Sequence, residues 1–159
     1  MDVGFTPYFK NCILNYFFNG DSDSSITNKF PCNLYVGLFV EQDAAVGPVE
    51  LTVGAYGYAR AKVEFNDLSA SGTIKNTSPV TFGKAEADWT SGGETITHIG
   101  IFTSHVDNDG EQVSDQSENP LDGAAVDSMI AFLPLAAEEQ VHEGEIFQLN
   151  PGAIKIQLI

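Results

Sequence analysis

The period of the hydrophobic pattern changes once along the chain, near residue 33. Before that point, apolar side chains recur at the three- and four-residue spacing of one helical face. They are Phe5, Phe9, Cys12, Ile13, Tyr16 and Phe17. Thr6 suits an N-cap and Pro7 the first helical position, while Gly20 can adopt the left-handed conformation that ends a helix. The sequence therefore predicts one helix over residues 6–19.

From Asn33 onwards the period becomes two, which is typical of strands. Leu34 to Val40 is a nearly continuous apolar run, as expected for a strand buried on both faces. Residues 58–65 alternate, with Tyr58, Arg60, Lys62 and Glu64 on one side and Ala59, Ala61, Val63 and Phe65 on the other. Residues 72–76 and 78–82 are expected to form two short strands, or one strand broken at Pro79. Further strands are expected at 95–103, 128–135, 145–149 and 153–158, and a loop at 41–57. Within 95–103 we expect Ile99 and Ile101 to point inward.

Short strands separated by turns, without intervening helices, predict a mainly β fold. We expect a β-sandwich or jelly-roll-like fold with one N-terminal α-helix. Residues 1–159 are predicted to form a single domain, with the sandwich over 33–159. An acidic insertion at 104–127, which carries seven Asp or Glu and no Lys or Arg, interrupts it. Loops of this length tend to be functional or mobile.

The charge balance narrows the possible partners. The chain has 7 Lys+Arg against 22 Asp+Glu, a formal net charge of −15. Nucleic acids and anionic membranes are bound by clustered Lys and Arg, so we expect neither as a partner. The acidity either keeps free copies soluble and apart, or complements a basic patch on a partner. The sequence has no run of 18 apolar residues and no N-terminal signal pattern, so neither a membrane span nor secretion is expected.

Residues for catalysis, cofactors or metals form no recognisable pattern. A Gly-x-Ser-x-Gly elbow and phosphate-binding glycine loops are absent. We interpret His98 as a packed or surface strand residue rather than a general base, Trp89 as a core residue, and Cys12 and Cys32 as buried thiols. Asp107–Glu111 lacks the ligand order of an EF-hand, although a weak cation site between subunits stays open. We therefore expect no catalytic, cofactor or metal site.

Several short motifs occur in a fixed order along the chain. Leu34-Tyr35-Val36-Gly37-Leu38-Phe39 comes first, followed by Gly57-Tyr58-Ala59-Arg60, Gly72-Thr73-Ile74-Lys75-Asn76, Val80-Thr81-Phe82 and Ala87-Asp88-Trp89. Thr97-His98-Ile99-Gly100-Ile101-Phe102 and Pro151-Gly152-Ala153 complete the series. In this order the motifs resemble those of a family of small tailed-bacteriophage virion proteins, often labelled tail fibre or decoration proteins. This chain departs from them in its acidic insertion and its aromatic N-terminal helix. It also has Gly57 directly before Tyr58, where the family has one residue between the glycine and the tyrosine.

The resemblance implies a non-enzymatic structural component of the virion, assembled in the host cytoplasm. Our first expectation is a capsid cement or decoration protein that stabilises the head through subunit contacts. The alternatives are a tail or tail-fibre adaptor, a carbohydrate-binding module for host attachment and, ranked last, a hydrolase. The expected partners are the major capsid protein or tail proteins of the same virion, together with further copies in a dimer or trimer. Candidate partner contacts are the aromatic residues Phe5, Tyr8, Phe17 and Phe18, of which Tyr8 and Phe18 lie off the main apolar stripe.

Overall fold

The structure is a computed structural model that describes residues 3–6, 9–10, 34–41, 45, 47–66, 73–102, 105–106, 112–113 and 129–157. The described part is mainly β, and every strand pair in it is antiparallel. The strands are β1 (Gly4–Phe5), β2 (Leu34–Glu41), β3 (Pro48–Glu50), β4 (Ala61–Val63), β5 (Thr73–Lys75), β6 (Val80–Lys84), β7 (Ile96–Phe102), β8 (His105–Val106), β9 (Gln112–Val113), β10 (Met129–Glu139), β11 (Ile146–Leu149) and β12 (Lys155–Gln157). The predicted mainly β class is confirmed.

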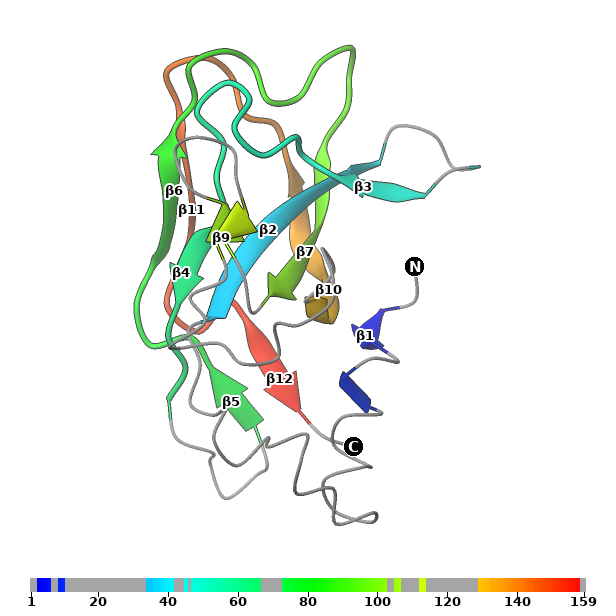
Figure 1. The fold of residues 1–159 in the computed structure, drawn as a ribbon, viewed down its shortest axis with the longest axis vertical. Coiled ribbons are helices and arrows are strands. Elements are labelled where there is room, and N and C mark those ends of the chain that lie inside the picture. Colours follow the sequence, from blue (N-terminus) through cyan, green and yellow to red (C-terminus); the bar gives the residue numbers. More distant parts are fainter. Residues whose placement is uncertain are drawn as a thin grey trace.

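A six-stranded sheet forms the centre of the fold (Figure 1). Its order is β1-β10-β7-β2-β3, and β4 pairs with the first half of β2 on the same edge as β3. Gly37 of β2 lies opposite Gly100 of β7, and Gly100 lies opposite Phe132 of β10. Three shorter sheets complete the described part: β11-β6, β12-β5 and β8-β9. The three long strands β2, β7 and β10 are therefore neighbours although they are distant in sequence.

The main core lies on one face of the central sheet, against the β6–β11 pair and the segments that lead to it. Val36, Leu38 and Val40 of β2 join Ile99 and Ile101 of β7 in one buried cluster. Phe82 of β6 and Phe147 of β11 belong to the same cluster, with their rings 5.6 Å apart. The inward position predicted for Ile99 and Ile101 is confirmed.

A second, smaller cluster lies among the residues that alternate with the first on β2, β7 and β10. It contains Phe39, Phe102, Met129 and Phe132, all buried. Phe39 stacks on Phe102 at 6.3 Å and meets Phe132 edge-on at 5.1 Å. Both sets of side chains of β2 are thus buried, which explains its continuous apolar run and confirms the prediction for it.

Three segments differ from the expectation. The predicted loop at 41–57 contains β3, and the acidic insertion contains the short antiparallel pair β8–β9. The strand predicted over 58–65 is shorter, since only Ala61–Val63 forms β4. Tyr58 precedes it in a tight turn, so its ring enters the main core instead of sharing a side with Lys62.

The described residues include only Thr6, Phe9 and Lys10 of the helix predicted over 6–19, so that helix is not shown. The Thr6 hydroxyl accepts a hydrogen bond from the Phe9 amide at 3.3 Å, and the Lys10 amide donates to the Thr6 carbonyl at 3.0 Å. These are the contacts expected of an N-cap. Residues 11–20, with Cys12 and later Cys32, lie outside the described residues, so the helix to residue 19 stays a prediction. Within the described ranges, no helix is long and apolar enough to cross a membrane.

Candidate functional site

Three of the sequence motifs meet at one buried ion pair. Arg60 forms a two-pronged contact with Glu50, with Nε–Oε1 and Nη2–Oε2 both at 2.8 Å. The Arg60 guanidinium also lies over the Phe102 ring, 3.4 Å from its centroid. Parallel hydrogen bonds and a flat aromatic surface suit a guanidinium better than an ammonium group. Arg60 therefore ties β3, the approach to β4 and β7 together.

Tyr58 completes this network with its hydroxyl group. The Leu38 amide donates to Tyr58 Oη at 2.8 Å, and Tyr58 Oη donates to Glu50 Oε1 at 3.2 Å. Burial of the ring, and then the nearby Glu50 charge, raise the pKa of Tyr58 well above the usual value of a phenol. The hydroxyl is therefore held protonated, as its donor role requires.

The glycines of the same motifs provide the room for these contacts. A Cβ at Gly37 would lie 2.5 Å from Glu50 Oε1 and 2.8 Å from Phe102 Cε2. A Cβ at Gly100 would lie 2.8 Å from both Met129 Sδ and Phe39 Cε2. Close approach of neighbouring side chains thus explains both glycines.

A second buried polar group joins two other motifs. Asn76 is 2% exposed, and its Nδ2 donates to the carbonyls of Ser78 (2.9 Å) and Asn150 (3.0 Å). Its Oδ1 accepts from the Ile154 amide at 2.9 Å, and the Gly152 amide donates to the Asn76 carbonyl at 2.9 Å. Asn76 therefore fixes the turn between β11 and β12 onto the end of β5. The motif residues described so far serve packing and hydrogen bonding.

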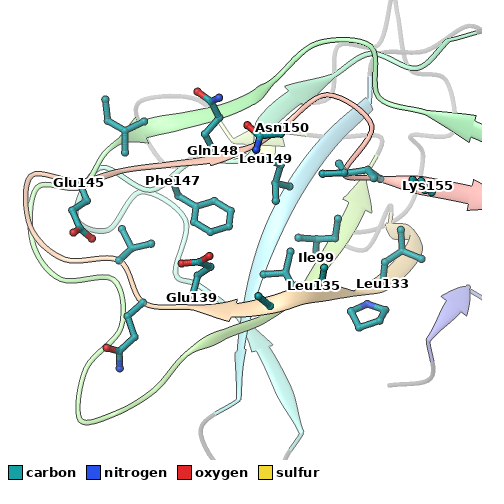
Figure 2. A pocket seen from close by; sticks show the side chains of 18 residues that line it. Ile99, Leu133, Leu135, Glu139, Glu145, Phe147, Gln148, Leu149, Asn150 and Lys155 are labelled. Carbon is teal, nitrogen blue, oxygen red and sulfur yellow. The ribbon is translucent and has the colours of Figure 1, made fainter.

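Among the described residues, two surface hollows are considered as candidate sites, and the larger of these two lies between β10 and β11 (Figure 2). Its volume is about 920 Å³. Leu133, Leu135 and Phe147 provide apolar lining, with Glu139 and Lys155 among its charged groups. Figure 2 shows the side chains of Glu139 and Phe147 facing the space between the two strands. This groove offers apolar surface to a ligand, and its polar groups form no set arranged for acid–base chemistry.

The bordering strand β10 carries features that oppose pairing with another strand. Its ladder with β7 is interrupted between Pro134 and Glu139, which face His98 and Ile96. Pro134 lacks an amide donor, and Glu138 and Glu139 follow in an exposed stretch. Proline, bulges and charges are the usual protection of exposed sheet edges. The groove is therefore poorly suited to accept an added β-strand.

The second hollow, which we call the end pocket, lies where the loops after β3, β6 and β10 gather at one end of the molecule (Figure 1). Its volume is about 630 Å³. Two of its lining residues, Val49 and Tyr56, are exposed large hydrophobic residues, and three more, Asp88, Glu94 and Glu143, are acidic. The Glu143 amide donates to Asp88 Oδ1 at 2.8 Å, which holds two of these loops together.

Tyr56 occupies an unusual backbone conformation in this pocket. The Tyr58 amide donates to the Ala55 carbonyl at 2.9 Å, closing a turn whose central residues are Tyr56 (φ 53°) and Gly57 (φ 77°). Such turns favour Asn-Gly, and a left-handed conformation costs other side chains about 1–2 kcal/mol. The Tyr56 carbonyl is held at 2.9 Å by both Trp89 Nε1 and the Glu86 amide. The exposed Tyr56 is therefore carried on a strained turn whose backbone is held by hydrogen bonds.

The structure places several of the residues singled out from the sequence. Trp89 is 6% exposed and packs edge-on against Tyr58 at 5.4 Å, so its predicted core position is confirmed. His98 stacks on Phe132 at 4.7 Å, which confirms a packed strand residue. Of the predicted partner contacts, Phe5 is half-buried and packs against the main core and Phe9, with ring centroids 5.0 Å apart.

The other three predicted contacts, Tyr8, Phe17 and Phe18, lie outside the described residues, so contact with a partner stays a prediction for all four. Asp107–Glu111, the segment compared with an EF-hand calcium loop, also lies outside the described residues. Among the residues that are described, no cluster of three or more His, Cys, Asp or Glu could hold a metal.

Sequence reasoning missed Glu50 and Tyr56. Glu50 lies in the segment predicted as loop, and the alternation over 58–65 places Arg60 on the side of the charged residues Lys62 and Glu64, so nothing in the pattern indicates a buried arginine that needs a carboxylate partner. For Tyr56 the sequence held only a weak indication of a strained turn, because Asn is the usual residue before the glycine of such a turn.

Together, the antiparallel sheets and the packing roles of the motifs define a β-rich protein whose motif residues stabilise its fold. The family model described as "Podophage GP4 fiber I protein gp80" matches residues 4–112, which is more than half of the chain. The chain belongs to this family of bacteriophage fibre proteins and is a structural component of a phage virion. The match spans the motifs from Leu34 to Phe102. A search of curated proteins finds no match.

Proposed function

We propose that this protein is a structural component of a phage tail fibre, which holds neighbouring virion proteins together without catalysing a reaction. The observation that carries the proposal is the family match over residues 4–112, because its description names a fibre protein. The buried roles of Arg60, Tyr58 and Asn76 support it, since the polar groups of the motifs are used to stabilise the fold.

We interpret the two-layered core as a β-sandwich of the jelly-roll-like kind. The central sheet and the β6–β11 pair contribute to one buried cluster, as facing sheets do in a sandwich. A scaffold of this kind is rigid and presents loops at its ends, which suits a connector between other proteins. We further propose tail proteins of the same virion as partners and a dimer or trimer as the assembled form.

Location in the particle tests this proposal against the capsid-cement alternative. Purified phage particles are labelled with gold-conjugated antibody against this chain and viewed by negative-stain electron microscopy. Gold on the tail fibres, with bare heads, is the expected result. Gold distributed over the heads would replace the fibre proposal with capsid cement. Particles of a mutant that lacks the gene provide the control for antibody specificity.

A further inference from the structure

The end pocket combines an exposed aromatic ring with a negative rim. Tyr56 is 61% exposed and Val49 is 41% exposed, and both line the pocket. Every charged side chain among its lining residues is acidic. Glu50 is already neutralised by Arg60, and the Asp88 carboxylate lies 3.7 Å from His142 Nδ1, which leaves Glu94 and Glu143 as the acidic groups around the exposed apolar surface. Aromatic anchors within a polar rim are typical of sites for protein partners.

The backbone at Tyr56 indicates that the ring is kept for a purpose other than stability. Asn would suit the turn better, and the ring of Tyr56 stays exposed instead of entering the core. Strained residues that the surrounding structure holds in place cluster at functional sites. The two hydrogen bonds to the Tyr56 carbonyl hold the backbone that carries the ring in place before any partner arrives.

We propose that the end pocket binds an arginine or lysine side chain of a protein partner within the virion, with the cation over the Tyr56 ring and near the carboxylates of Glu94 and Glu143. An aromatic face attracts a cation, and the carboxylates add charge complementarity. This inference rests on the proposed function, because it describes how the protein contacts a neighbouring virion protein.

Charge identifies the kind of partner. With 7 Lys+Arg against 22 Asp+Glu, a second copy of this chain would bring mainly negative charge to the pocket. Like charges across an interface oppose binding, whereas a basic segment of a different protein is attracted. A neutral glycan could stack on the ring but would gain nothing from the excess negative charge.

Binding of a fluorescein-labelled hexa-arginine peptide, followed by fluorescence anisotropy, tests the proposal on the purified full chain. Tyr56→Asn leaves the net charge unchanged and is expected to raise the dissociation constant at least about threefold. Tyr56→Phe keeps the ring and should bind within about twofold of the wild type. Because Asn suits the turn, Tyr56→Asn should also raise Tm by about 2–4 °C, which excludes unfolding as the cause of lost binding.

A matched pair of charge changes separates the pocket from general attraction to an acidic protein. Glu94→Gln/Glu143→Gln changes the pocket, whereas Glu138→Gln/Glu139→Gln makes the same charge change at exposed positions of β10. The first pair should weaken peptide binding more than the second. Equal losses in both pairs, or an unchanged dissociation constant for Tyr56→Asn, would overturn the proposal. Loss of glycan-array binding in Tyr56→Asn without any change in peptide binding would assign the pocket to a sugar instead.

Particle assembly keeps this inference separate from the proposed function. Phage carrying Tyr56→Asn should incorporate less of the chain than wild-type phage, whereas Tyr56→Phe should be incorporated normally. Equal incorporation of the wild type and Tyr56→Asn would reject the pocket and leave the proposed function standing. Absence of the wild-type chain from particles would reject the proposed function whatever the peptide results.

Discussion

At the scale of single residues, buried polar groups hold together elements that are distant in sequence. Arg60 and Glu50 form an ion pair in which the arginine side chain is only 4% exposed. A buried charge is tolerated only with a partner and with hydrogen bonds, and here Glu50 receives them from both Arg60 and Tyr58. The alternation around Ala61 predicts a strand there, although a longer one than β4. It cannot identify Glu50 as the partner of Arg60, because this pairing depends on contacts between different strands.

The raised pKa of Tyr58 gives a prediction for alkaline solution. In the unfolded chain the phenol ionises near its usual pKa of about 10, whereas in the folded protein it keeps its proton to a higher pH. Tyr58 therefore contributes its full stability below pH 10, and this contribution falls as the pH rises towards the folded-state pKa. Between these two pKa values, the free energy of unfolding falls by up to about 1.4 kcal/mol per pH unit because of Tyr58.

Urea unfolding between pH 8 and 11 measures this effect. Tyr58→Phe should be less stable at pH 8, because the Leu38 amide loses its acceptor. Above pH 10 the variant should lose stability less steeply than the wild type, so that the two curves converge. Parallel curves throughout would show that Tyr58 is not held protonated by the fold.

At the scale of elements, strands that lie in a long or regular pattern are predictable, and so are the short strands β5, β11 and β12, whereas β3 is not. The apolar run from Leu34 and the alternation around Ile99 predict β2 and β7 because many residues share one period. β3 has three residues among glycine and proline, and only its pairing with Phe39, Val40 and Glu41 makes it a strand. Such tertiary pairing leaves no period in the sequence.

Asn76 provides a prediction about how the elements are joined. Asn76→Ala would leave the Ser78 and Asn150 carbonyls and the Ile154 amide without this partner, and we expect a loss of about 3 kcal/mol. Asn66→Ala is the matched control, because the exposed Asn66 side chain accepts one hydrogen bond from Lys75. The control should lose at most about 1 kcal/mol. Urea unfolding of both variants measures the difference, and equal losses would contradict the linking role of Asn76.

At the scale of the whole molecule, the ordered motifs predicted the family better than they predicted a site. Residues such as Gly37, Arg60 and Phe102 come from different motifs that are distant in the sequence, and the fold brings them close together. The end pocket was not predictable, because its walls come from three loops that only the folded chain brings together. Its carboxylates belong to an acidic excess spread along the sequence, in which no single pair is marked.

The central claim is that this chain is a fibre component of the virion that acts by binding its neighbours. The most direct measurement is its copy number relative to the major capsid protein, by quantitative mass spectrometry of purified particles. Fibres are built as small symmetric oligomers, so the account predicts a constant ratio equivalent to on the order of tens of copies per particle. A chain absent from particles and found only as a free monomer would contradict it.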